Sequence, residues 1–80
     1  MRLPRDIDGE KLARCLKALG YRITRQRGSH MRLTTQTGGK HHEVIPKHKP
    51  LKPGTLDGIL KSIACHHGMK RDELLKYLDL

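Results

Sequence analysis

Hydrophobic residues near the start of the chain recur at the spacing of a helix. They lie three or four positions apart, as Leu12, Leu16 and Leu19. This spacing places apolar side chains on one face of an α-helix and leaves the other face to polar residues. Asp8 is a suitable N-cap, and Gly20 is a natural residue to follow the last turn. The pattern predicts an amphipathic helix over residues 7–20.

After Gly20 the period of the apolar positions changes to two. The apolar members of this alternation are Tyr21, Ile23, Met31 and Leu33. Glycine-containing turns are expected at residues 26–29 and 37–40, and a third strand is expected over residues 41–46. Short alternating segments joined by tight turns are typical of an antiparallel meander. The sequence therefore predicts a three-stranded antiparallel sheet.

Two further helices are expected in the C-terminal third. A proline-punctuated basic connection over residues 46–53 precedes Thr55, which we expect to cap a helix ending at Gly68. The helical spacing there involves Leu56, Ile59, Leu60 and Ile63. A last helix is expected over residues 70–78. The order α-β-β-β-α-α predicts an α+β fold in a single domain, residues 1–80, with helices covering one face of the sheet and the other face open.

The net charge of the chain indicates which classes of molecule it is suited to bind. The 80 residues contain 17 Lys and Arg against 8 Asp and Glu, which gives a net charge of +9. Such an excess favours a polyanionic partner, first of all a nucleic acid. Aromatic residues make up only 2% of the chain, so base stacking on an aromatic platform is disfavoured and contact through the phosphate backbone is expected. No apolar run approaches transmembrane length, so we expect no membrane association and a cytoplasmic location.

The strongest candidate for chemistry is the stretch RQRGSHMRL, residues 25–33. If Met31 and Leu33 point into the core, His30 and Arg32 point to the open face. A histidine can move protons near neutral pH, and arginines can offset the charge of an anionic transition state. The alternative interpretation is a solvated histidine in a basic hairpin, and spacing alone favours that alternative.

The remaining histidines do not form a recognisable metal site. His41 and His42 are neighbours on a predicted strand and face opposite sides, and His66 and His67 lie at the end of a predicted helix. No spacing completes a tetrahedral ligand set, so we expect no metal and no other cofactor. The basic connection after Pro46 is instead a candidate for phosphate contacts.

Three segments together resemble the HicA-type toxins. These are LPRD with the helix that follows it, RQRGSHMRL in the centre, and PKHKPLKPGTL before the next helix. The resemblance covers nearly the whole chain in order. It implies a fold like the double-stranded-RNA-binding domain, α-β-β-β-α with an additional short C-terminal helix. Lys70 and Arg71 depart from it, because relatives commonly have a Ser or Thr cap and then acidic residues at this point.

The resemblance also implies a function. Members of the HicA family are mRNA interferases, endoribonucleases that block translation and are neutralised by a HicB-type antitoxin. The single catalytic histidine of the family corresponds to His30. Residues expected to bind RNA are Arg25, Arg27, Ser29, Arg32, Lys47, His48 and Lys49. Two alternatives to an endoribonuclease remain open. The chain is then either a non-catalytic RNA-binding module of the same fold or a subunit that only docks an acidic protein.

Overall fold

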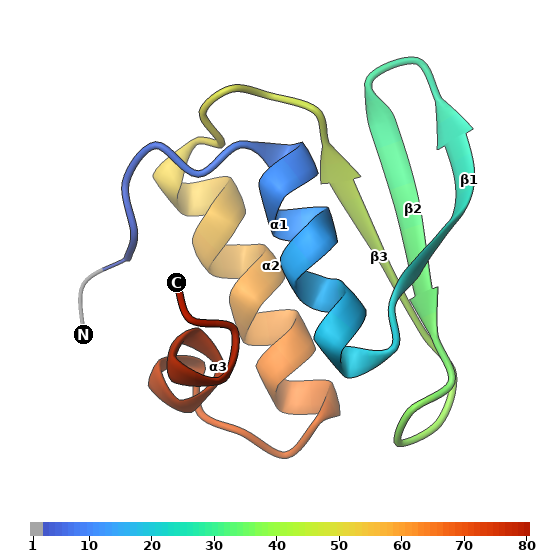
Figure 1. The fold of residues 1–80 in the computed structure, drawn as a ribbon, viewed down its shortest axis with the longest axis vertical. Coiled ribbons are helices and arrows are strands. Elements are labelled where there is room, and N and C mark those ends of the chain that lie inside the picture. Colours follow the sequence, from blue (N-terminus) through green and yellow to red (C-terminus); the bar gives the residue numbers. More distant parts are fainter. Residues whose placement is uncertain (1–2) are drawn as a thin grey trace.

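The computed structural model describes residues 3–80 and has three helices, a short 3-10 segment and one sheet (Figure 1). The elements in chain order are α1 (Gly9–Cys15), η1 (Leu16–Leu19), β1 (Arg22–Arg27), β2 (His30–Thr35), β3 (His41–Pro46), α2 (Pro53–His66) and α3 (Arg71–Tyr77). The α+β class and the predicted order of elements are confirmed.

The first helical segment, residues 9–19, is slightly shorter than the expected range of 7–20, but it has the expected N-cap and the expected glycine after its last turn. The Asp8 carboxylate accepts a hydrogen bond from the backbone N–H of Lys11 at 2.6 Å, as an N-cap should. The helix is not uniform, because its last turn tightens into the 3-10 segment η1. Gly20 then adopts a left-handed conformation, with φ of 80°, which ends the helix and directs the chain into the sheet.

The three strands form an antiparallel meander in the order β1-β2-β3. Strand β1 pairs Arg27 with His30 across the tight turn at Gly28, whose φ is 56°. The register between β1 and β2 shifts between Ile23 and Arg25, so Thr24 has no partner in the ladder. Such a bulge bends a strand locally and re-aims its side chains.

One apolar residue of the alternation in β1 is not buried. Ile23 pairs with buried Leu33 and so faces the same side of the sheet, but its relative exposure is 51%. Figure 1 gives the reason, since β1 is the edge strand farthest from the helices and no helix packs over it. Every residue of β1 is exposed.

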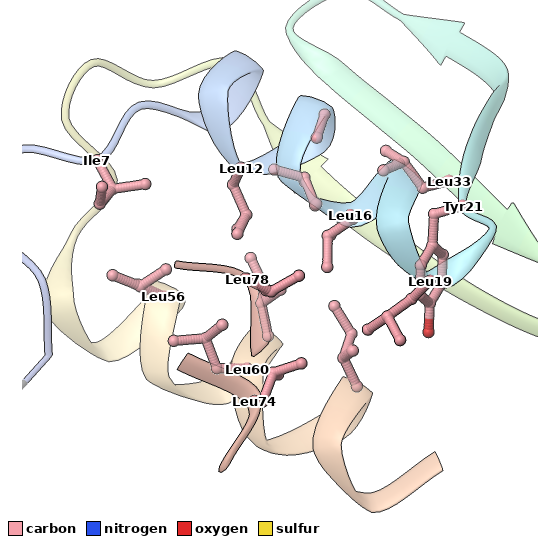
Figure 2. Packing of buried hydrophobic residues seen from close by; sticks show 14 of the residues in the cluster. Ile7, Leu12, Leu16, Leu19, Tyr21, Leu33, Leu56, Leu60, Leu74 and Leu78 are labelled. Atoms are coloured by element: carbon pink, nitrogen blue, oxygen red, sulfur yellow. The ribbon is translucent and has the colours of Figure 1, made fainter. Parts of the chain in front are cut away.

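The hydrophobic core lies between the sheet and the helices. Met31 and Leu33 of β2 are each 1% exposed, as the alternation predicts, and they pack with leucines and isoleucines of all three helices (Figure 2). Burying each such side chain contributes roughly 1.5–3 kcal/mol to stability. On β3 the alternation separates buried Ile45 from Val44, which is 48% exposed on the opposite face.

Helix α2 starts earlier than expected, whereas α3 agrees with the expected range to within one residue. Helix α2 begins at Pro53 rather than after Thr55, and its N-cap Lys52 makes no side-chain capping bond. Proline suits this position, because its missing N–H would have no helical partner there. The helix ends at His66, just before Gly68, whose φ is 67°.

Helix α3 is tied to α2 by an ion pair. The Arg71 guanidinium donates to the Asp57 carboxylate at 2.8 Å, and Lys61 reaches the same carboxylate at 3.0 Å. Hydrogen bonds from Arg71 and then Lys61 hold the pKa of Asp57 below its ordinary value. At the helix start, the Glu73 carboxylate accepts from the backbone N–H of Lys70 at 3.0 Å. Arg71, a residue at which the chain departs from the resemblance, thus joins α3 to α2 through an ion pair.

All three helices lie on one side of the sheet, so the other face of the strands is open (Figure 1). Within residues 3–80, no helix has the length and apolar character needed to span a membrane.

Candidate nucleic-acid interface and active site

The open face of the sheet holds a hollow of about 200 Å³ around His30. It is lined by Arg25, Arg27, His30, Arg32 and Val44. The strand register explains this grouping, because Arg27 pairs with His30, and Arg32 pairs with Arg25 on one side and Val44 on the other. His30 is exposed, so its imidazole is free to meet a ligand from solvent. The structure therefore brings together four of the residues expected from the sequence.

Positive charge is concentrated in this hollow without a carboxylate among its lining residues. Arg25 and Arg32 stand directly opposite each other on neighbouring strands. Like charges in that relation repel and destabilise a sheet. An anion placed between them would relieve the repulsion, and a phosphodiester has the charge and the oxygens to accept from both guanidinium groups.

Arg32 is held by a network that the sequence did not reveal. One terminal nitrogen of its guanidinium, Nη2, lies 3.3 Å from Nε2 of His42. His42 Nδ1 lies 2.7 Å from the Thr34 hydroxyl, which lies 2.8 Å from the hydroxyl of Thr24. The Nε atom of Arg32 is buried and has no hydrogen-bond partner within the described chain.

The basic connection lies beside the hollow but does not line it. The backbone N–H of Lys47 donates to the carbonyl of Ser29 at 2.6 Å, which joins the connection to the β1–β2 turn. Lys47 and Lys49 line a separate hollow at the start of α1, together with Asp8 and Arg14. Ser29, His48 and these two lysines are all exposed.

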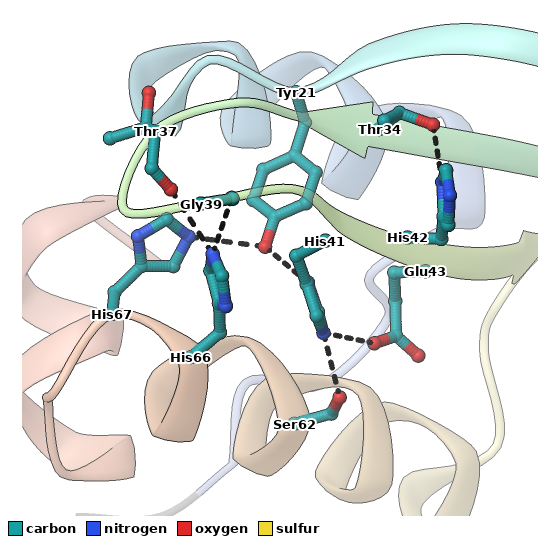
Figure 3. Close-up of polar contacts among 10 residues, drawn as sticks. All are labelled: Tyr21, Thr34, Thr37, Gly39, His41, His42, Glu43, Ser62, His66 and His67. Atoms are coloured by element: carbon teal, nitrogen blue, oxygen red, sulfur yellow. Dashed lines mark hydrogen bonds and ion pairs between the residues drawn. The ribbon is translucent and has the colours of Figure 1, made fainter.

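A second group of polar residues lies at the opposite end of β3 (Figure 3). The Tyr21 hydroxyl lies 2.8 Å from Nδ1 of His41 and 3.1 Å from Nε2 of His67. The ring of His66 stacks on that of His41, with 4.5 Å between centroids, and its Nε2 lies within 3.1 Å of two carbonyls of the β2–β3 turn. These contacts fasten the end of α2 to the sheet. The group stabilises the fold and lies away from the His30 hollow.

Acidification should weaken this second group. Desolvation, followed by the charges of His66 and His41, lowers the pKa of His67 below its ordinary value. The unfolded chain therefore binds a proton at a higher pH than the folded chain does, so the free energy of unfolding falls as pH drops below about 6.5. We expect urea denaturation at pH 5.5 and 7.5 to show this loss, and the His67→Gln variant to show a smaller one. An equal loss in both proteins would contradict the assignment.

No group of three or more histidine, cysteine, aspartate or glutamate side chains between Leu3 and Leu80 is arranged to hold a metal ion. The clustered His41, His66 and His67 are engaged with the Tyr21 hydroxyl, with Ser62 or with backbone carbonyls instead.

The family to which the chain belongs follows from a comparison with protein-family models. The model described as "HicA toxin of bacterial toxin-antitoxin" matches residues 9–64, more than half of the chain. The chain belongs to the HicA toxin family. No curated protein and no solved structure matches it. The match runs from α1 through most of α2 and includes the whole open face of the sheet.

Membership of the HicA family indicates the kind of system in which the protein acts. The protein is a toxin of a toxin–antitoxin system, so an antitoxin is its expected partner. The matched region includes His30 and the arginines around it, whereas α3 lies outside it. The cationic hollow around His30 thus lies within the region that the family model matches.

Proposed function

We propose that this HicA protein is a metal-independent endoribonuclease that cleaves mRNA and uses His30 for proton transfer. The observation that carries the proposal is the hollow in which one accessible imidazole is surrounded by Arg25, Arg27 and Arg32 with no carboxylate. The arginines would bind the scissile phosphate and its neighbours, and they would offset the charge that develops in the transition state. The family match supports this function.

A single imidazole suits a reaction in which the RNA supplies its own nucleophile. His30 accepts the proton of a ribose 2′-hydroxyl, the 2′-oxygen bonds to phosphorus, and the bond from phosphorus to the 5′-oxygen breaks. The protonated imidazole or a water molecule then gives a proton to the 5′-oxygen. This reaction needs the 2′-hydroxyl, so DNA of the same sequence should bind and remain uncut.

The proposed partners are mRNA and a HicB-type antitoxin. Because the hollow is cationic, an antitoxin that silences the toxin should place acidic groups against Arg25, Arg27 or Arg32 and cover His30. Complementary charge of this kind accelerates encounter and selects the correct partner. Hydrogen-exchange protection on β1 and β2 in the complex would support this mode, whereas protection confined to α3 would contradict it.

Removal of metal ions should leave cleavage intact. The described residues offer no metal-ligand cluster, and the proposed chemistry requires none. We expect a labelled RNA to be cut at the same rate with and without excess EDTA. Loss of activity on chelation, followed by recovery with one added metal, would refute the metal-independent mechanism.

RNA affinity should depend steeply on salt. Phosphate contacts release counterions, and each contact with a single strand contributes about 0.7 to the slope of log K against log salt concentration. Replacing Arg27 or Lys49 with alanine should reduce the slope by about that amount and weaken binding to different RNAs equally. Lys76→Ala, an exposed change in α3, serves as the control. Selective loss of one RNA sequence would contradict backbone recognition.

The same hollow also fits a non-catalytic RNA-binding module. An RNA that is bound but never cut, by wild type or by any variant, would establish this second function. Accessible His30 favours catalysis, because a binding module needs only the arginines.

A further inference from the structure

We propose that His42 is a positioning residue for RNA cleavage, which holds the Arg32 guanidinium at the His30 hollow while neutral and releases it on protonation. This inference rests on the proposed function. His42 does not line the hollow itself. It pairs with Thr34 on β2, two residues from Arg32 and four from His30, so its side chain projects from the same open face.

Donor and acceptor chemistry fixes the direction of the hydrogen bond between Arg32 and His42. A guanidinium group can only donate, so Nε2 of His42 must accept from Nη2 of Arg32 across their 3.3 Å separation. The neutral imidazole then carries its proton on Nδ1. This N–H donates to the Thr34 hydroxyl at 2.7 Å, a contact drawn in Figure 3.

The remaining two bonds return the network to Arg32. The Thr34 hydroxyl donates to the Thr24 oxygen at 2.8 Å, and the Thr24 hydroxyl donates to the backbone carbonyl of Arg32 at 3.3 Å. Each hydroxyl donates one proton and accepts one, so all four bonds run in the same direction around a closed ring. Hydrogen bonds in such a chain polarise and strengthen one another.

The bulge in β1 makes this ring possible. Thr24 is the residue left without a ladder partner where the register shifts, and its hydroxyl reaches the open face beside Thr34. The next residue, Arg25, pairs with Arg32. The irregularity thus places a hydroxyl and a guanidinium from consecutive residues around the same arginine.

Protonation of His42 is incompatible with the ring. A proton on Nε2 would remove the lone pair that accepts from Arg32 and would place two cations in contact. The charges that act on His42 are those of Arg32 on β2, Lys40 in the turn and His41 on β3, and each of them opposes a further positive charge on the ring. The next residue, Glu43, faces the opposite side of the sheet, where it contacts His41. Partial desolvation and then these charges lower the pKa of His42, which favours the neutral form at neutral pH.

Two substitutions separate these effects. His42→Ala removes the acceptor, and His42→Gln supplies an amide that can accept from Arg32 but cannot be protonated. We expect His42→Ala to reduce kcat/KM about 10- to 100-fold, the loss that a small misplacement of a catalytic-site group produces. His42→Gln should retain most activity at neutral pH and lose less activity than wild type on acidification.

A double-mutant cycle tests whether His42 acts through Arg32. The Arg32→Ala variant should be impaired, and adding His42→Ala to it should cause no further loss. Multiplicative losses in the double variant, or an acid limb of the pH profile that is identical in wild type and His42→Gln, would overturn the proposal.

NMR distinguishes failure of this inference from failure of the proposed function. In the free protein, ¹⁵N shifts should show the Nδ1–H tautomer of His42. The Arg32 side-chain signals should broaden in parallel with His42 protonation in wild type and remain unchanged in His42→Gln. If these signals behave so and RNA is never cleaved, the ring stands but its role in cleavage is refuted. If RNA is cleaved and His42 has the other tautomer, only the ring is refuted.

Discussion

Replacing His30 with alanine should abolish RNA cleavage and leave the fold intact. The side chain is exposed on the open sheet face, and its neighbours Met31 and Leu33 supply the core packing of β2. Exposed substitutions of this kind usually change stability by less than about 0.5 kcal/mol. General acid–base catalysis contributes a factor of about 10² to 10⁴. The loss of activity should therefore far exceed any loss of stability.

The measurement combines cleavage of a labelled RNA, thermal melting and growth arrest on expression. His30→Ala should melt like wild type, bind RNA and no longer arrest growth. Gln26→Ala is a matched control, because Gln26 is an exposed residue of the same hairpin that pairs with buried Met31 and faces the other side of the sheet. An unfolded His30→Ala variant would contradict the site assignment, as would a folded variant that still cleaves.

Among glycine-to-alanine substitutions, Gly9→Ala should cause the largest loss of stability. A β-carbon at Gly9 would collide with the backbone carbonyl of Pro46, at the end of β3. Backbone atoms cannot give way as a flexible side chain does, so we expect a loss near the upper part of the overpacking range, about 3 kcal/mol. For a domain of this size that corresponds to a fall in Tm of more than about 10 °C.

The Gly9 substitution should also reach the RNA-binding region. The backbone N–H of Gly9 donates to the carbonyl of His48 at 3.0 Å, so displacing α1 would displace the basic connection. Gly58→Ala is the matched control, since nothing lies within 4 Å of its added carbon. In the interior of α2 that change should stabilise by about 0.5–1 kcal/mol. A Gly9→Ala variant as stable as wild type would show that α1 and β3 can separate without cost.

Local patterns sufficed for the fold and for the orientation of His30. The helix cap at Asp8 and the alternation around Met31 depend on residues close in sequence, and both are confirmed. The alternation could not show that Ile23 is exposed, because burial on an edge strand depends on whether a helix covers it, which is a tertiary property. Thr55 was misplaced as a cap because Pro53 already starts the helix. The order of the helices and strands was predictable, whereas the covering of β1 by a helix and the exact first residue of α2 were not.

The partners of Arg32 could not be found by the same reasoning. His42 reaches it only through the pairing of β2 with β3, and Thr24 reaches it only because of the bulge. Register across strands depends on the whole sheet, and one irregular residue changes which side chains meet. The adjacent residues His41 and His42 face opposite sides of β3, as their spacing predicts, but the spacing did not indicate which residues each ring would contact.

The arginines of β1 have a consequence for how the molecule behaves at high concentration. An exposed edge strand is a template for pairing with the edge of another chain, and natural proteins guard such edges with charge. A second copy of β1 would bring Arg22, Arg25 and Arg27 against their own equivalents, which like-charge repulsion opposes. A variant with these arginines replaced by apolar residues would lose more than affinity for RNA. It would also expose Ile23 on an unguarded edge, so its loss of toxicity could reflect fibrous aggregation rather than a disabled site.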